Sequence, residues 1–238
     1  VSAAAQRAAF SALGSSSGAA VVLDARTGAV LALVATPSFD PQVLAPNDPG
    51  PVRSAYEQLS TDPAQPLQDR AISRAYTPGS LFQLITAASA LTSGRFQPTT
   101  DVAIPAAYGS GSTTVLGIAA GMVLMSGASS SPAMVAASIA DGGTLMTPYI
   151  VADVRAPNLA VVEQAKPTVR ATPLSARDAR ALANMTLGVD GVTSCRECSF
   201  AGFPLHLLTA SGKPAWAIGF AGRYAVASMV EAGPVLPA

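Results

Sequence analysis

Side chains that exchange protons near neutral pH are scarce in this chain of 238 residues. It has one histidine, His206, and two lysines, Lys166 and Lys213. General acid–base catalysis at neutral pH depends on His, or on Lys and carboxyl groups whose pKa values are shifted by their surroundings. The composition therefore limits the chemistry that can be assigned before any motif is considered.

The two cysteines form the motif Cys195-Arg-Glu-Cys198, which is compatible with a short disulfide loop, a redox pair or half of a zinc site. The zinc interpretation lacks a second ligand pair, because only His206 remains to be recruited, and the redox interpretation lacks a βαβ context. We expect a structural or incidental cysteine pair of undetermined oxidation state, with no metal site and no cofactor.

Ser80 lies where a helix is expected to begin. Thr77-Pro78-Gly79 interrupts the helical pattern of residues 70–91, so a new helix is predicted from about Ser80 to Gly94. A serine at this place is explained by helix N-capping alone. A catalytic role for Ser80 therefore needs support from other segments.

The overall composition excludes several classes of protein. Apolar residues make up 50% of the chain and charged residues 12%, which is incompatible with a disordered chain. Fourteen basic residues balance fourteen acidic ones, so no basic surface for nucleic acid is expected. The sequence has no continuous apolar run of 18 residues and no signal-like start, so we expect a soluble chain whose membrane attachment would need a further segment.

The pattern of elements predicts an α+β fold. The chain shows a hairpin at the start, helices in the middle and three strands at the end. This order predicts a five-stranded antiparallel sheet formed from both termini, with helices packed on it. The expected strands cover residues 18–35 as a hairpin, 145–154, 205–210, 215–221 and 224–231. Besides the helix at 80–94, helices are expected at 131–140, with Ser131 as N-cap, at 175–187, and briefly at 52–59 within a loop of residues 37–66.

Five segments, in the same order, resemble the transpeptidase domain of penicillin-binding proteins, in the serine β-lactamase-like superfamily. They are Val22–Leu33, Ala35–Pro41, Arg70–Gln83, Ser131–Tyr149 and Ala215–Ala221. The resemblance leaves residues 97–120 and 155–200 poorly matched. It implies one domain over residues 1–238, with a reduced helical subdomain around residues 97–130.

The resemblance assigns the nucleophile to Ser80, at the position where the family's serine attacks an acyl carbonyl. The family's lysine, one helical turn later, corresponds to Gln83, whose amide cannot accept a proton. The family's Ser-x-Asn motif has no counterpart anywhere in the sequence. The Lys-Thr-Gly motif corresponds to His206-Leu207-Leu208, followed by Thr209. His206 would take the place of a substrate-binding lysine, and Leu208 that of a glycine against which the acyl group lies.

Two functions follow from the resemblance. The first is a peptidoglycan-synthesis domain that is impaired or inactive in acyl transfer, a pseudoenzyme. The second is an active serine D,D-transpeptidase or D,D-carboxypeptidase that binds penicillin and is acylated at Ser80, with backbone amides of Ser80 and of a residue near Leu208 as the oxyanion hole. A peptidoglycan stem peptide, a β-lactam and envelope-assembly proteins are the implied partners, at the outer face of the cytoplasmic membrane.

Purely structural roles for His206 and Lys213 are also compatible with the sequence. His206 on an apolar strand is compatible with a half-buried sheet residue, and Lys213, before Pro214, with a solvated loop. An unrelated hydrolase triad would need His206 close to Ser80 in space, because no carboxyl group lies near His206 in the sequence.

Overall fold

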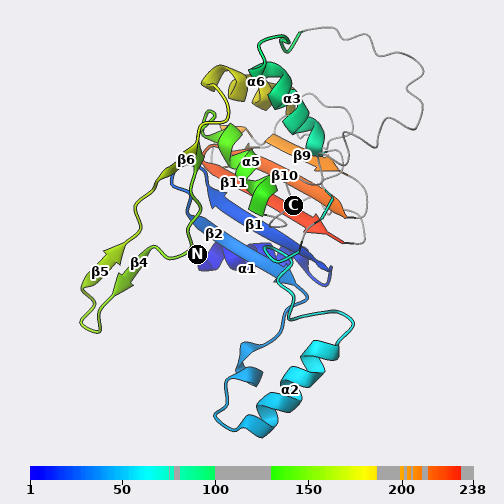
Figure 1. Ribbon diagram of the computed structural model, residues 1–238, viewed down its shortest axis with the longest axis vertical. Coiled ribbons are helices and arrows are strands. Elements are labelled where there is room, and N and C mark those ends of the chain that lie inside the picture. The colour runs from blue at the N-terminus through cyan, green and yellow to red at the C-terminus, as the bar shows by residue number, and fades with distance from the viewer. Residues whose placement is uncertain are drawn as a thin grey trace.

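A five-stranded antiparallel sheet forms the centre of the computed structural model, which describes residues 1–74, 76–77, 81–99, 130–186, 199–200, 203–204, 206–210 and 214–231. The strand order is β2 (Val30–Thr36), β1 (Gly18–Asp24), β11 (Tyr224–Val230), β10 (Ala215–Ala221) and β9 (His206–Ala210). β1 pairs with β11, so strands from the two ends of the chain lie side by side (Figure 1). The predicted fold class and the five strands are confirmed.

Two helices cover opposite faces of this sheet. Alternate residues of β1 belong to separate apolar clusters: Ala19 and Val21 pack with α5 (Ser130–Ala140), and Ala20 packs with the end of α1 (Ala3–Leu13). This follows from the two-residue period of a strand, and it explains why β1 is apolar at nearly every position. The sequence analysis predicted no element for α1.

Gln6 of α1 also protects the outer edge of the sheet. Its side-chain oxygen accepts a hydrogen bond from the backbone N–H of Leu33 in β2 at 2.9 Å, and its Nε2 donates to the Leu33 carbonyl at 2.7 Å. Gln6 thus makes the pair of bonds that a neighbouring strand would make. Exposed edges are sites of unwanted strand pairing, so α1 both covers a face and shields an edge.

The helices at the middle of the chain agree with the sequence patterns, with one correction. α5 begins at Ser130, so Ser131 lies inside the helix and is not its N-cap. α6 (Ala176–Thr186) starts as predicted, with the Ser175 hydroxyl accepting a bond from the Asp178 N–H and donating to the Asp178 carboxylate. α3 (Phe82–Thr92) confirms the helix expected after Gly79, and Gly94 follows it with a positive φ of 70°.

Residues 145–154 do not form the single strand that was predicted. β3 (Leu145–Met146) pairs with β6 (Val169–Ala171), and β4 (Asp153–Arg155) pairs with β5 (Val161–Gln164) in a separate hairpin. Between them, Pro148 has no N–H to donate to a ladder, and Tyr149 exchanges backbone hydrogen bonds with Gly28 and Val30. A tertiary contact therefore divides the expected strand.

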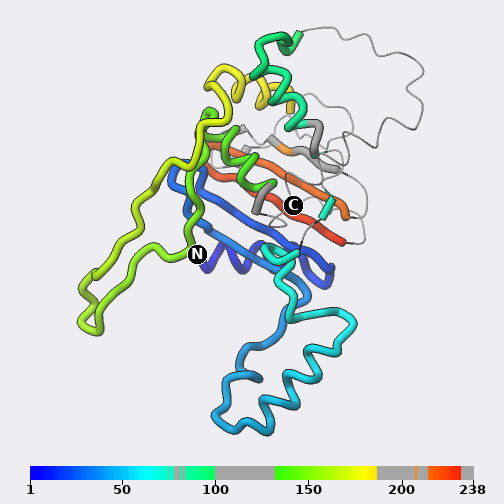
Figure 2. Tube along the Cα trace, in the orientation of Figure 1, coloured from blue at the N-terminus to red at the C-terminus, as the bar shows by residue number. Residues whose placement is uncertain are grey.

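Two segments extend away from the sheet. The β4–β5 hairpin projects on one side, and the region after β2 projects on another (Figure 2). That region holds a short 3-10 helix η1 (Pro41–Leu44) and α2 (Pro49–Thr61), which is longer than the helix predicted at 52–59. Neither η1 nor α2 has a buried residue. The short pair β7 (Ser199–Phe200) and β8 (Phe203–Pro204) completes the described strands.

Several predictions fall on residues outside the described ranges. These are the reduced helical subdomain, of which residues 100–129 are not described, the Cys195–Cys198 pair, and the loop position of Lys213. They stay predictions.

Candidate active site

The start of α3 carries the first two candidate residues. Ser80 lies outside the described residues, two positions before the helix begins at Phe82. Gln83 is the second residue of α3, in its first turn. The N-cap position belongs to Leu81, which provides no side-chain hydrogen bond to the helix. The placement of Gln83 one turn after Ser80 stays a prediction, because Ser80 is not described.

The other candidates lie on the edge strand β9. His206 pairs with Phe220 of β10, Leu208 with Ile218 and Thr209 with Ala217. Leu207 between them is half-buried and pairs with Gly219. α6 contacts both α3 and β9, so it is one element that holds the two parts of the candidate site in the same body. The triad hypothesis needs a short distance between Ser80 and His206. It stays a prediction, because Ser80 lies outside the described residues.

A buried tryptophan anchors the chain that leads to Ser80. The indole Nε1 of Trp216, at the start of β10, donates a hydrogen bond of 2.9 Å to the carbonyl of Thr77. Its ring meets Tyr76 edge to face, with centroids 6.4 Å apart and planes at 83°. Trp216 is completely buried. Because β10 is the direct neighbour of β9, this contact fixes Thr77 relative to the part of the sheet that carries the other candidates.

A charged cluster of Arg70, Arg74, Tyr76 and Glu231, here called the Glu231 cluster, holds the same segment. The Tyr76 hydroxyl donates to Glu231 Oε1 at 2.5 Å, and Arg74 Nη1 lies 3.0 Å from that oxygen. Arg70 Nε approaches it to 3.3 Å as an ion pair without hydrogen-bond alignment, while both Nη atoms donate to carbonyls of residues 64–68. The Arg74 guanidinium also lies over the Tyr76 ring at 5.3 Å.

The environment of this cluster shifts two pKa values in opposite directions. Burial raises the pKa of Tyr76, and the hydrogen bond to Glu231 and the nearby negative charge raise it further, far above its ordinary value. Burial alone would raise the pKa of Glu231, but the Tyr76 hydrogen bond and the two guanidinium groups outweigh it and lower that pKa. At neutral pH the cluster therefore holds a neutral tyrosine and an ionised glutamate between two cations.

The sequence analysis named Arg70, Tyr76 and Trp216 only as parts of matched segments and missed Glu231. Tyr76 and Glu231 are 155 residues apart, and no local pattern joins them. The Tyr76 segment belonged to the resemblance and the strand at 224–231 did not, so the sequence offered no sign of this pair. The structure adds that they meet at the point where the chain enters the candidate nucleophile position.

The sequence of this chain is similar to those of known transpeptidases. Residues 18–120 match the family model of the penicillin binding protein transpeptidase domain. Peptidoglycan D,D-transpeptidase PbpA of Mycobacterium tuberculosis is 49% identical over 77 residues, which are 32% of this chain and 16% of that protein. MrdA of Escherichia coli, also a peptidoglycan D,D-transpeptidase, is 44% identical over 82 residues, which are 34% of this chain and 12% of that protein.

Solved structures extend the similarity to nearly the whole chain. Penicillin-binding protein A of M. tuberculosis, as an imipenem acyl-enzyme complex, has a TM-score of 0.82 and 25% identity over 96% of this chain and 72% of that one. Its penicillin G acyl-enzyme complex gives a TM-score of 0.75 with 25% identity, over 94% of this chain and 72% of that one. This chain therefore shares the fold of penicillin-binding protein A.

The family match, the sequence relatives and the shared fold agree on one assignment. They support a penicillin-binding protein transpeptidase domain in this chain. Its sequence alignment covers less than a fifth of the length of the two curated relatives described above. Among the described residues, no helix combines the length and the hydropathy needed to cross a bilayer.

Proposed function

We propose that this domain takes part in peptidoglycan synthesis with acyl transfer at Ser80 impaired or absent. The observation that carries the proposal is Gln83, which stands in the first turn of α3 where the family resemblance expects a lysine. A carboxamide donates and accepts hydrogen bonds but has no basic nitrogen, so it cannot take the proton of an attacking serine. Loss of general-base assistance costs about 10²- to 10⁴-fold in rate.

The edge strand supports the same proposal. His206 and Leu208 occupy β9 positions that resemble the lysine and glycine of the family's third motif. Histidine, with an ordinary pKa of about 6.5, is mostly neutral at pH 7 and would offer the substrate carboxylate less positive charge than lysine. A leucine in place of glycine adds bulk where the acyl group would lie. Thr209 remains as a hydroxyl group on this strand.

A second candidate function is an active D,D-transpeptidase or D,D-carboxypeptidase acylated at Ser80. Two of the similar solved structures support it, because they are acyl-enzyme complexes with imipenem and with penicillin G. A β-lactam can acylate a serine once even where turnover is slow, so labelling and turnover have to be measured separately.

The proposed partners follow from the family. A peptidoglycan stem peptide would bind along β9, and envelope-assembly proteins would bind elsewhere on the domain. The proposed location is the outer face of the cytoplasmic membrane, with attachment through a segment beyond this sequence.

The deciding experiment incubates the purified 238-residue chain with a fluorescent penicillin and measures covalent labelling with time. We expect little or no labelling that depends on Ser80. Ser80→Ala is the control for the nucleophile, and Ser93→Ala is the matched control for an exposed serine at the other end of the same helix region. Robust labelling that is lost in Ser80→Ala and retained in Ser93→Ala would overturn the impaired assignment.

Gln83→Lys tests how much of the impairment comes from the missing base. We expect this variant alone to stay poorly labelled, because the third motif and the Ser-x-Asn motif also depart from the family. Labelling of Gln83→Lys at the rate of an active penicillin-binding protein, measured beside it, would instead assign the whole defect to position 83.

A further inference from the structure

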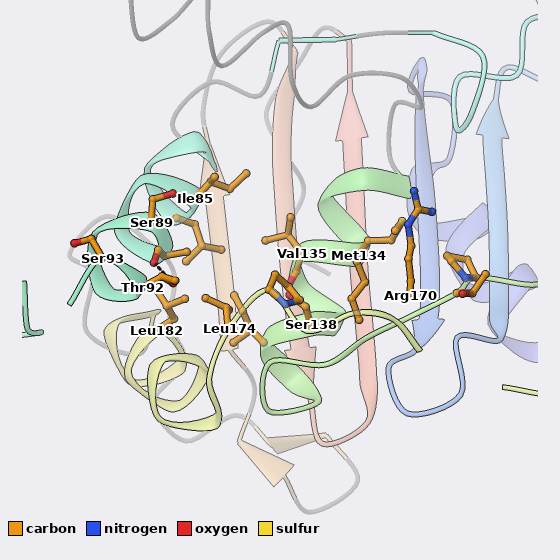
Figure 3. A pocket seen from close by; sticks show the side chains of 17 residues that line it. Ile85, Ser89, Thr92, Ser93, Met134, Val135, Ser138, Arg170, Leu174 and Leu182 are labelled. Carbon is orange, nitrogen blue, oxygen red and sulfur yellow. Dashed lines mark hydrogen bonds between the residues drawn. The ribbon is translucent and has the colours of Figure 1, made fainter. Parts of the chain in front are cut away.

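A large apolar groove lies between α3, α5, α6 and the loops around β3 and β6. Its volume is about 1020 Å³, and seventeen of the described residues line it (Figure 3). Aliphatic side chains supply most of the wall, namely Leu84 and Ile85 from α3, Val135 and Ile139 from α5, Leu174, and Leu182 from α6. Small-molecule sites in proteins are commonly of this size and are mainly apolar, with few polar groups.

Three of the five hydroxyl-bearing residues in this wall already donate hydrogen bonds within the protein. Thr92, Ser93 and Ser138 each donate a hydrogen bond to a backbone carbonyl of their own helix or its end, at 2.8, 2.7 and 2.9 Å. They therefore add little polarity along the length of the groove. A ligand that lies against this wall is favoured by burying hydrocarbon and not by forming hydrogen bonds.

Arg170 is the single charged side chain among the seventeen lining residues. It belongs to β6, it is exposed, and it lies at the opposite end of the lining from Ser93 (Figure 3). No ion pair in the described part of the chain involves it. A guanidinium presents parallel N–H donors that match a carboxylate. The groove thus combines a long apolar wall with one cation at one end.

We propose that this groove binds a long-chain fatty acid. The hydrocarbon chain lies along α3 and α5, and the carboxylate meets the Arg170 guanidinium. Among the described lining residues Arg170 carries the one charge, which matches a ligand with a single negative charge and an apolar body. This proposal does not rest on the proposed chemistry at Ser80.

The test compares palmitate with the uncharged alcohol of the same chain length, 1-hexadecanol. Both displace a fluorescent fatty acid from the full 238-residue chain, below the concentration at which they aggregate. We expect saturable binding of one palmitate per chain, about fivefold tighter than that of the alcohol, as for a partly exposed charged pair. Arg170→Ala should weaken palmitate to the level of the alcohol and leave the alcohol unchanged.

Matched variants separate the groove from general effects. Lys166→Ala removes an exposed cation that precedes β6 and does not line the groove, and it should leave both affinities unchanged. Ser89→Trp places a large ring in the groove from an exposed position of α3 and should abolish binding, whereas Ser60→Trp on the exposed face of α2 should not. Circular dichroism establishes that each variant is folded.

Three results would overturn the proposal. One is the absence of saturable palmitate binding by the full chain. Another is a palmitate-to-alcohol preference that persists unchanged in folded Arg170→Ala. The third is full binding by folded Ser89→Trp, which would place the ligand elsewhere.

Discussion

Replacing Glu231 by alanine should destabilise the domain, because its carboxylate joins three side chains. Oε1 of Glu231 receives the Tyr76 hydroxyl at 2.5 Å and lies 3.0 Å from Arg74 and 3.3 Å from Arg70. The Arg70 side chain is only 3% exposed, so Glu231→Ala leaves a buried guanidinium without its counter-ion. The Tyr76 hydroxyl also loses its acceptor.

The magnitude follows from how deeply each group is buried. Breaking a fully buried ion pair costs about 3–5 kcal/mol. The Glu231 side chain is 22% exposed and that of Arg74 is 41% exposed, so water recovers part of this cost. We therefore expect a loss of about 2–3 kcal/mol in the free energy of unfolding, which corresponds to a fall in Tm of roughly 4–12 °C for a domain of this size.

Thermal and urea unfolding of the wild type and of Glu231→Ala measure this loss. Glu163→Ala is the matched control, because Glu163 is an exposed carboxylate on β5, and it should change stability by less than about 0.5 kcal/mol. Glu231→Gln keeps a hydrogen-bond acceptor for Tyr76 and removes the charge. Its free energy of unfolding should therefore lie between those of Glu231→Ala and Glu163→Ala. The reasoning is refuted if Glu231→Ala is no less stable than Glu163→Ala.

The pH dependence provides a second check on the same residue. The pKa of Glu231 is lower in the folded protein than its ordinary value of 4.5, so the folded state binds fewer protons in that range. The stability that Glu231 contributes is complete above the ordinary pKa and is lost as the pH falls through the lower, folded value. The stability difference between wild type and Glu231→Gln should therefore shrink on acidification below about pH 4.5. A difference that grows on acidification would contradict this sign.

Three further changes test other contacts. Trp216→Phe removes the 2.9 Å hydrogen bond to Thr77 and should cost about 1–3 kcal/mol in urea unfolding, since the Thr77 carbonyl loses its donor. Gly143→Ala places a methyl group 2.2 Å from the Leu174 carbonyl oxygen, at a residue whose φ is 99°. It should lower Tm clearly more than Gly142→Ala, whose methyl group would have open space. Equal effects of the two variants would exclude the clash as the cause. Gln6→Ala uncovers the edge of β2 and should increase light scattering at high protein concentration, which a Gln58→Ala control on α2 should not do.

Local patterns account for the parts of the fold that were predicted correctly. The hairpin of β1 and β2 follows from two apolar runs around a turn, and the start of α6 follows from the reciprocal bonds of Ser175 and Asp178. Both arise from residues a few positions apart, where the chain's own geometry decides the outcome. The same holds for α3, which places Gln83 in its first turn.

Contacts between distant segments account for what the sequence analysis missed. The strand expected at 145–154 is divided because Tyr149 bonds to Gly28 and Val30, more than a hundred residues earlier. α1 has its place because Gln6 completes the edge of β2, and no pattern within residues 1–13 specifies that partner. Such pairings depend on which surfaces remain to be buried or hydrogen-bonded once the sheet exists.

The sequence by itself determined which chemical groups this protein has and the order in which they occur. A glutamine stands three residues after Ser80, the chain has a single histidine, and no Ser-x-Asn triplet exists. These facts are covalent and need no fold to establish them. Only the tertiary structure decided that Glu231 meets Tyr76 and that Arg170 stands at the end of an apolar groove, because burial and charge pairing are properties of segments brought together in space.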